Sequence, residues 1–216
     1  MSAGILVRPE RKDDRRAAEE VTREAFWNLH SPGCNEHYLL HLLRESGAFI
    51  GALDWVAEKD GRVAGSIVYS RSKILGDDGR IHAAITFGPV AVLPALQGKG
   101  IGSLLIRRTL EEARKLGHQA VLIYGDPAYY ARFGFQGAER FDIRSHDNCY
   151  ADALEALELS PGALSGRAGR FSEDAIFDMD EAAAEAFDRS FPPKVKLTGL
   201  PSQARFLEVA GRRRAR

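Results

Sequence analysis

Three glycines, Gly98, Gly100 and Gly102, stand together in the segment VLPALQGKGIG, directly before a run with helical spacing. Glycine disfavours helix interiors, so this grouping at a helix start indicates that something comes close to the backbone. The first N–H groups of a helix have no partner inside the helix, and the helix dipole adds partial positive charge there. The pattern therefore predicts an anion site built from backbone amides, with a glycine-rich turn that binds nothing as the alternative.

Two well-known phosphate motifs do not fit this segment. A P-loop needs Gly-Lys followed by Ser or Thr, but Gly98-Lys99 is followed by Gly100. A dinucleotide fingerprint needs a third glycine three residues after the second, where Ser103 or Leu105 stands, and it must follow a strand directly. The spacing fails both tests, so the anion would be a diphosphate held in some other way.

The hydrophobic pattern predicts the elements that must position this segment. We expect a strand at 4–10, helices at 13–29 and 34–46, and three antiparallel strands between Trp55 and Leu93, joined at Asp60-Gly61 and Asp78-Gly79. A helix over 102–116 between strands favours a parallel pair with that helix as the crossover. The strand at 119–126 then leads into a short helix, with Asp126 as its N-cap and Pro127 in its first turn.

The pattern is weaker beyond residue 140. Residues 151–159 alternate like a strand, although their composition also suits a helix. We expect a loop at 160–170 and a helix within 178–191, ended by Pro192-Pro193. The last five residues, RRRAR, are interpreted as a solvated tail rather than a nucleic-acid patch.

Composition excludes several functional classes. The 216 residues are 44% hydrophobic and 28% charged, as in an ordinary globular protein, and 30 Lys and Arg balance 30 Asp and Glu. No net charge attracts nucleic acid or an anionic membrane. No apolar run approaches the ~20 residues of a membrane-spanning helix, and no signal-peptide pattern is apparent. Cys34 and Cys149 lie far apart without metal-type spacing. We expect a cytoplasmic protein without a metal and with no nucleic-acid or membrane partner.

QGKGIG, preceded by VAVLP and followed by LLIRRTLEEARKLG, resembles the acyl-CoA-binding motif of the GNAT superfamily of N-acetyltransferases, written Q/R-x-x-G-x-G/A. YYARFGF at 129–135 resembles the superfamily's Tyr-x-x-x-Gly-Phe segment. The stretch from FGPVAVLP to GDPAYYARFGF is especially similar to a bacterial subfamily of predicted GNAT acetyltransferases. The resemblance covers about residues 5–140 and is sharp over 87–135.

The resemblance implies an α+β fold of α/β/α layers. Its mixed, mostly antiparallel sheet would have a parallel fourth and fifth strand that splay apart, with Gly88-Pro89 as a plausible bulge in the fourth. We expect residues 1–140 to form the acetyltransferase core. Residues 141–216 would be a C-terminal extension packed on or next to that core rather than an independent domain.

The resemblance also implies the residues that bind acetyl-CoA. Backbone groups of 90–92 would pair with the pantetheine arm, one N–H polarising the thioester carbonyl, and the amides of 97–102 would hold the diphosphate. Lys99 either contacts phosphate or is solvated, and the sequence favours solvation. Asp126 is interpreted first as an N-cap and second as a ligand contact. The full set is Val90, Ala91, Val92, Gln97, Gly98, Lys99, Gly100, Ile101, Gly102, Ser103 and Asp126.

Tyr130 matches the superfamily's frequent catalytic tyrosine, whose phenol protonates the departing CoA sulfur; a packing role is the alternative. The general base has no clear match. His82 is the one titratable group on the body of the fourth strand, and Glu36 lies where the superfamily's helices shape the acceptor pocket. Each has a structural alternative, and a water relay without a single base is a third possibility.

The resemblance therefore implies an acetyl-CoA-dependent N-acetyltransferase that acts directly, through a ternary complex. The acceptor would be a small-molecule amine or a protein or peptide amine, and the enzyme a monomer or homodimer. The alternatives are an acyltransferase that uses another acyl-CoA or an O-acceptor, and a non-catalytic module that senses acyl-CoA.

Overall fold

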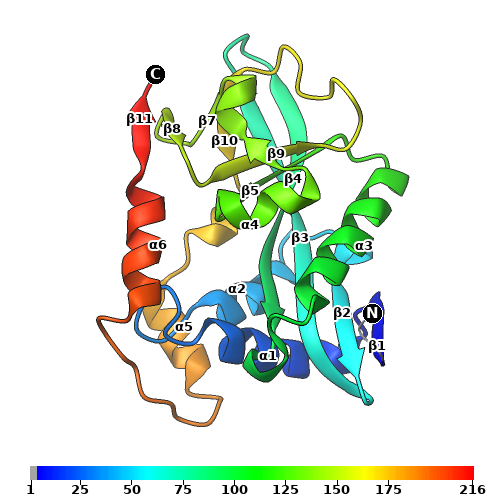
Figure 1. Ribbon diagram of the computed structural model, residues 1–216, viewed down its shortest axis with the longest axis vertical. Helices are drawn as coiled ribbons and strands as arrows, with labels where there is room; N and C mark the ends of the chain where they lie inside the picture. The colour runs from blue at the N-terminus through cyan, green and yellow to red at the C-terminus, as the bar shows by residue number, and fades with distance from the viewer. Residues whose placement is uncertain (1–3) are drawn as a thin grey trace. The chain divides into compact units, whose positions relative to one another are not determined.

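The computed structural model describes residues 4–216, and through residue 135 its elements follow the periodicity of the sequence (Figure 1). These elements are β1 (Ile5–Pro9), α1 (Arg15–Phe26), α2 (Glu36–Leu43), β2 (Trp55–Lys59), β3 (Arg62–Gly76), β4 (Ile81–Val92), α3 (Ile101–Lys115), β5 (Ala120–Tyr124) and α4 (Pro127–Tyr130). They are followed by β6 (Gln136–Gly137), β7 (Ile143–Arg144), β8 (Cys149–Ala151), β9 (Leu154–Glu158), β10 (Gly169–Ser172), α5 (Glu181–Asp188), α6 (Pro201–Gly211) and β11 (Arg213–Ala215).

The two predicted Asp-Gly turns are confirmed. Asp60 and Gly61 join β2 to β3 with φ of 50° and 76°, the two left-handed residues of a tight hairpin turn. Gly79 has φ of 78° in the connection from β3 to β4. Glycine and aspartate tolerate this conformation, so these turns fix where the long strands begin and end.

The chain forms two compact units, each assembled from separate segments. The first contains the residues up to Tyr69, with Gly88–Thr109 and Ala175–Ala204. The second contains Ser70–Phe87, Leu110–Asp174 and Arg205–Arg216.

In the first unit, β1, β2 and the start of β3 form an antiparallel sheet. Helices α1 and α2 pack side by side, and α5 packs against α2 (Figure 1). The core under these helices is made of buried side chains from α1, α2, β2 and β3, namely Ala18, Leu39, Leu40, Leu43, Val56 and Val68. Burial of each larger side chain contributes about 1.5–3 kcal/mol, which fixes α1 and α2 on the sheet.

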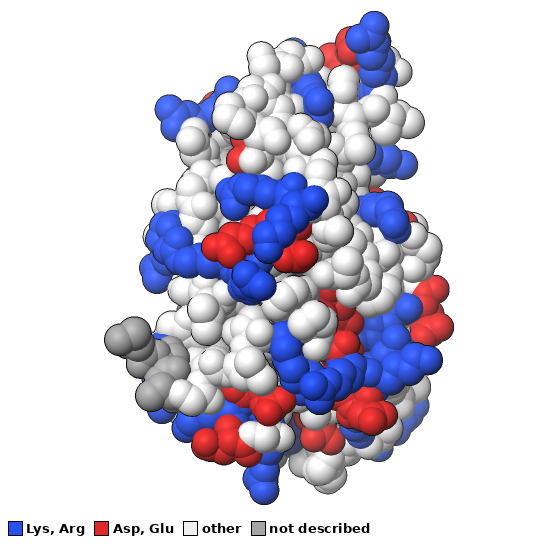
Figure 2. All heavy atoms as spheres, turned by 90° about the vertical axis from the view of Figure 1, so that its right-hand side faces the viewer, with Lys and Arg blue, Asp and Glu red and all other residues white. Residues whose placement is uncertain are grey.

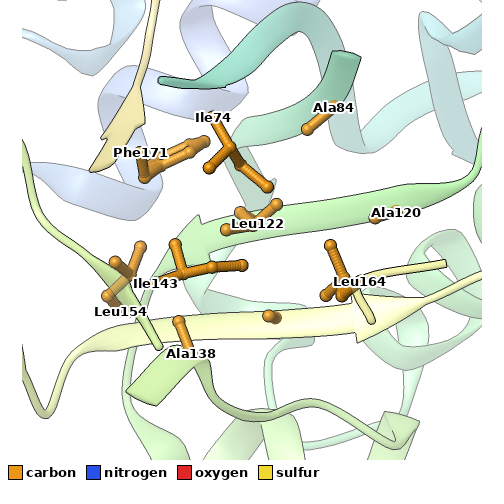
Figure 3. Packing of buried hydrophobic residues seen from close by; sticks show 10 residues of the cluster. Ile74, Ala84, Ala120, Leu122, Ala138, Ile143, Leu154, Leu164 and Phe171 are labelled. Atoms are coloured by element: carbon orange, nitrogen blue, oxygen red, sulfur yellow. The ribbon is translucent and has the colours of Figure 1, made fainter. Parts of the chain in front are cut away.

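In the second unit, β5 pairs antiparallel with β9, and β9 pairs antiparallel with β6. Strand β10 pairs antiparallel with the end of β3 and parallel with β7. One face of this sheet carries a second core, in which Leu122, Leu154 and Phe171 are almost completely buried (Figure 3).

Strand β4 runs parallel to β5, and within the described chain one pair of partners joins them, Ile85 with Val121. The parallel pair confirms the crossover prediction for α3. Its single register position agrees with the splay that the family resemblance implies. A mixed, mostly antiparallel sheet that includes this parallel pair, together with the helices, confirms the α+β class.

Three elements beyond residue 160 were not predicted. Strand β10 begins inside the segment expected to be a loop, and α6 has no counterpart in the sequence prediction. The C-terminal RRRAR is not a simple solvated tail, because Arg213–Ala215 form β11, which pairs antiparallel with β8. Arg213 also pairs with Asp147 at 2.5 Å, and Arg216 with Asp77 at 3.0 Å.

Part of the predicted C-terminal extension is tied to the loop between α1 and α2 through Asn28. The Asn28 side chain donates to the Val195 carbonyl (3.0 Å) and accepts from the Gly33 and Leu197 amides (2.9 and 3.0 Å). Gln203 donates to the Asn28 carbonyl at 3.2 Å. Asn28 is 7% exposed and has φ of 62°, a conformation that asparagine tolerates better than most residues. This residue therefore holds residues 195–203 against the loop.

Replacing Asn28 should destabilise the first unit. Asn28→Ala removes one buried and two partly buried side-chain hydrogen bonds and leaves a residue that disfavours this φ, so the free energy of unfolding should fall by about 2–4 kcal/mol. Asn28→Gly loses the same bonds without the backbone strain and should cost about 1 kcal/mol less. Urea denaturation measures both variants. A loss below about 0.5 kcal/mol in each would show that these contacts do not stabilise the fold.

Candidate functional site

The glycine loop, residues 94–100, connects the end of β4 to the start of α3. Gly98 and Gly100 have φ of 72° and 83°, and a Cβ added to either would meet open space. The glycines are therefore required by backbone conformation and not by crowding. Their surroundings leave the loop backbone open to a ligand.

Helix α3 begins directly after this loop. The Leu104 amide donates to the Gly100 carbonyl at 3.0 Å, so the amides of Ile101, Gly102 and Ser103 precede the first helical hydrogen bond. The dipole of this 15-residue helix adds partial positive charge at the same end. The arrangement is suited to an anion such as a diphosphate.

The side chains of the glycine loop brace the loop itself. Gln97 Nε2 donates to the Val92 carbonyl at 3.0 Å, and Lys99 Nζ donates to the Ala95 carbonyl at 2.9 Å. Lys99 is exposed, so its ammonium contacts the loop from the solvent side, and its role toward a phosphate stays a prediction. These contacts hold the backbone shape that exposes the amides.

Just before the loop, β3 comes unusually close to β4. A Cβ at Gly65 would lie 2.8 Å from the Ala91 carbonyl oxygen, a distance that no real Cβ accepts. Ala91 is buried, and Val90 and Val92 are half-buried. The sequence prediction did not include Gly65, although an isolated glycine within a strand pattern is a known sign of close backbone approach.

In the second unit, Asp126 caps α4. Its carboxylate accepts from the Ala128 amide at 2.9 Å, and Pro127 occupies the first helical turn, which confirms the N-cap prediction. Arg205 Nη2 approaches the other Asp126 oxygen at 3.5 Å. Since α4 spans only Pro127–Tyr130, this cap fixes the helix backbone and with it the direction in which the Tyr130 side chain points.

The Tyr130 ring lies in an aromatic cluster. The centroids of Phe87 and Phe135 are 5.9 and 5.8 Å from it, and those of Tyr129 and Phe133 are 5.0 and 6.3 Å away. Burial among these rings, with Tyr129 as a lesser cause, raises the pKa of Tyr130. The phenol therefore keeps its proton at neutral pH and is chemically a proton donor.

The two candidate acceptor residues lie in different units, and each has local partners. Glu36, at the start of α2 in the first unit, is 3.1 Å from His30 Nδ1 and accepts from the Asn35 amide at 3.1 Å. His82, on β4 in the second unit, is mostly buried, with Nε2 3.5 Å from Asp78 Oδ1. These contacts fit the structural interpretation of both residues, and their roles toward an acceptor stay predictions.

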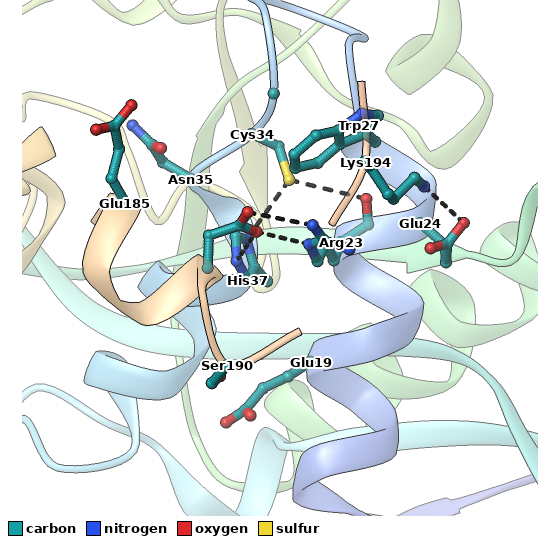
Figure 4. A network of polar contacts seen from close by, with 12 residues as sticks. Glu19, Arg23, Glu24, Trp27, Cys34, Asn35, His37, Glu185, Ser190 and Lys194 are labelled. Carbon is teal, nitrogen blue, oxygen red and sulfur yellow. Dashed lines mark hydrogen bonds and ion pairs between the residues drawn. The ribbon is translucent and has the colours of Figure 1, made fainter. Parts of the chain in front are cut away.

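A Cys–His–Asp series lies in the first unit (Figure 4). Cys34 Sγ is 3.5 Å from His37 Nδ1, and His37 Nε2 is 3.1 Å from Asp188, which Arg23 also binds at 2.6 and 3.1 Å. Burial raises the pKa of the Cys34 thiol and lowers the pKa of His37 to about 4. The thiol therefore stays protonated beside a neutral imidazole, which is the opposite of an activated nucleophile.

Two residues of the second unit, Gly125 and Glu155, were missed from the sequence. A Cβ at Gly125 would run into the Tyr130 ring, 2.5 Å from Cδ2. Glu155 on β9 is 2% exposed, and burial, with nearby Asp126 as a second cause, raises its pKa to about 7. Gly125 directly precedes Asp-Pro at a strand end, which is a turn signal, but no local signal marks Glu155 as buried.

Neither the face shown in Figure 2 nor the metal-ligand pattern of the described residues indicates a second site. On the face shown in Figure 2, Lys and Arg side chains are interspersed with Asp and Glu. Among residues 4–216, no three His, Cys, Asp or Glu side chains are grouped so that they could hold a metal ion. No helix in this part of the chain is long and apolar enough to cross a membrane.

Comparison with known proteins gives a consistent result. A family model described as an acetyltransferase (GNAT) domain matches residues 52–137. The uncharacterized N-acetyltransferase YhbS of Escherichia coli K12 is 31% identical over 166 residues, which cover 76% of this chain and 93% of YhbS. The uncharacterized N-acetyltransferase YjhQ of the same strain is 33% identical over 165 residues, 72% of this chain and 86% of YjhQ.

Two solved structures are similar over most of their length. The crystal structure of YhbS from E. coli in complex with CoA has a TM-score of 0.73 and 28% identity, covering 83% of this chain and 94% of that one. A GNAT family acetyltransferase from Brucella melitensis in complex with acetyl-CoA has a TM-score of 0.65 and 32% identity, covering 81% and 98%.

Ionisation of Glu155 should make stability depend on pH. The folded state keeps a proton up to about pH 7 that the unfolded chain releases near 4.5, so wild-type stability should fall as pH rises between these values, by at most about 1.4 kcal/mol per pH unit. Glu155→Gln cannot ionise and should gain stability relative to wild type at pH 8 but not at pH 4. Urea denaturation at both pH values measures this, and an equal difference at both would contradict it.

Proposed function

Because the chain belongs to the GNAT family of N-acetyltransferases, we propose that it transfers the acetyl group of acetyl-CoA directly to an amine, within a ternary complex of both substrates. The observation that carries the proposal is the glycine loop, whose left-handed Gly98 and Gly100 expose backbone amides at the start of α3. The CoA and acetyl-CoA complexes belong to the related structures and support the same donor for this chain.

The residues of the glycine loop would hold the donor. The amides from Gln97 to Gly102 bind the diphosphate, and the Ser103 hydroxyl adds a further hydrogen bond. Backbone groups of Val90–Val92 pair with the pantetheine arm as a neighbouring strand would. Bound acetyl-CoA supplies an acyl thioester, which an amine can attack without help from a metal.

Three groups of this chain would act on the reacting atoms. A main-chain N–H within Val90–Val92 polarises the thioester carbonyl, which favours attack by the amine nitrogen. A C–N bond forms as the C–S bond breaks, and Tyr130 donates its phenolic proton to the departing sulfur. The attacking nitrogen loses its proton to water or to a base, for which Glu36 and His82 remain the candidates.

Direct transfer is favoured over an acyl-enzyme pathway by the state of Cys34. A covalent route needs a thiolate, but burial raises the pKa of the Cys34 thiol and its His37 neighbour stays neutral. The thiol therefore lacks both the charge and the base that a nucleophile needs. The acceptor in our proposal is a small-molecule amine or a peptide amine.

The central test is release of CoA thiol when the protein is incubated with acetyl-CoA and a panel of amino acids, polyamines, aminoglycosides and peptides. For any active amine, Tyr130→Phe should lower kcat about 100-fold, since general acid catalysis contributes at least this factor, and change KM for acetyl-CoA little. Steady-state kinetics measures both constants.

Tyr129→Phe is the matched control, because it removes a neighbouring hydroxyl from the same aromatic cluster, and it should retain near wild-type kcat. An unchanged rate in Tyr130→Phe would remove the acid assignment. Tight acetyl-CoA binding without thiol release from any amine would favour the acyl-CoA-sensing alternative. Faster turnover with another acyl-CoA or an alcohol would favour a different acyltransferase.

The donor loop can be tested separately by binding. Gly100→Ala forces a Cβ into φ of 83°, which costs about 1–2 kcal/mol and should weaken CoA binding roughly tenfold by reshaping the loop. Gly79→Ala is the control, because Gly79 has φ of 78° and equally open surroundings in the β3–β4 turn. Calorimetric titration with CoA measures both, and equal weakening in the two variants would contradict the assignment.

A further inference from the structure

The Tyr130 ring is confined by aromatic side chains from three parts of the second unit. Phe87 comes from β4, Tyr129 from α4 itself, and Phe133 and Phe135 from the segment that follows. The Phe87 and Phe135 rings also contact each other, with centroids 6.0 Å apart in an edge-to-face arrangement. Contacts of this kind are favourable beyond the area they bury, so the ring would lose them if it moved away from these neighbours.

The backbone of Gly125 lies against another part of the ring. A Cβ built on Gly125 would lie 2.5 Å from Cδ2 of Tyr130 and 3.3 Å from Cζ. Real Cβ atoms essentially never come within 3.0 Å of another heavy atom. The Tyr130 ring therefore occupies the space that any side chain at position 125 would need.

Neither partner in this contact is free to shift. The Gly125 amide donates to the Ala153 carbonyl at 2.8 Å, which fixes the glycine to the turn before β9. On the other side, Asp126 caps α4 and Pro127 restricts its first turn, so the backbone carrying Tyr130 is held as well. A methyl group at position 125 would have to displace the ring itself.

We propose that Gly125 is a positioning residue that fixes the Tyr130 phenol, because its missing side chain lets the ring pack directly on the strand end. The proposal rests on the function proposed above for Tyr130, as the acid that protonates the departing sulfur. Proton transfer requires the phenol oxygen within hydrogen-bond reach of the sulfur, so a displacement of about 1 Å lowers the rate while the substrates still bind.

The test is a double-mutant cycle between Gly125→Ala and Tyr130→Ala. Its readouts are kcat with an active amine and Tm from thermal denaturation. Where no acceptor is known, Tm is the only readout. Gly125→Ala should lower kcat at least tenfold, leave KM for acetyl-CoA within threefold, and lower Tm. In the Tyr130→Ala background, where the ring is gone, the same change should alter neither kcat nor Tm further.

Gly137→Ala is the matched control. Gly137 has φ of −51°, and a Cβ there would meet nothing within 4 Å, so alanine should be accepted in β6 without loss of rate or Tm. Wild-type kcat and Tm in Gly125→Ala would overturn the proposal. An equal fall in Tm with and without the Tyr130 ring would also overturn it, because the glycine would then act on something else.

The cycle also separates this proposal from the proposed function. A wild-type rate in Tyr130→Phe refutes the acid role, since that variant keeps the ring and loses the hydroxyl. The Tm coupling between positions 125 and 130 does not depend on catalysis and still decides whether Gly125 fixes the ring. If Tyr130→Phe is slow but the Tm coupling between positions 125 and 130 is absent, the positioning role is refuted and the acid role is not.

Discussion

Strands β4 and β5 are paired at one position, Ile85 with Val121. The positions of several candidate-site residues depend on the end of this pairing. Two parallel strands that stayed paired would satisfy each other's backbone groups along their whole length. Because the register does not continue within the described chain, Phe87 on β4 can pack against Tyr130 and Phe135. In the function proposed above, backbone groups of Val90–Val92 would bind a ligand shaped like an extended peptide.

Glycine serves two different physical needs around this site. At Gly98 and Gly100 the backbone adopts positive φ in open surroundings, so the requirement is conformational. At Gly65 and Gly125 a neighbouring group occupies the space of a Cβ, so the requirement is room. A sequence motif contains only the letter G in both cases. The distinction predicts different consequences of an alanine, local strain in the first case and displacement of a neighbour in the second.

Local patterns predicted the elements up to residue 135 well. The Asp60-Gly61 turn, helix α3 and the Asp126 cap each rest on contacts within a few residues, which the sequence records directly. The β4–β5 splay and the residues of the site came instead from resemblance to a family. Resemblance transfers an expected role to a position but gives no information about the residues that pack against it. A role was therefore predicted for Tyr130, whereas its contact with Gly125 was not.

The later part of the chain was harder to predict for physical reasons. Strands of two or three residues, such as β7 and β8, are too short to show a period of two, and pairing with distant partners alone makes them strands. Helix α6 carries Phe206 and Leu207 next to each other and partly exposed, at 43% and 68%, so it has no clear apolar face. The contacts of Asp188 also leave no local signal, because its partners Arg23 and His37 lie more than 150 residues earlier in the sequence.

Burial acts on two reactive groups of this protein with opposite chemical consequences. At Tyr130 the loss of water raises the pKa of the phenol, so the group keeps its proton at neutral pH but becomes a weaker acid. At Cys34 the same effect keeps a thiol protonated, and by lowering the pKa of His37 it also weakens the base that could activate the thiol. A buried Cys–His–Asp series is therefore better explained as packing that secures Asp188 and α5 than as a covalent site. Burial thus leaves both groups protonated at neutral pH, which argues against Cys34 as the nucleophile of an acyl-enzyme.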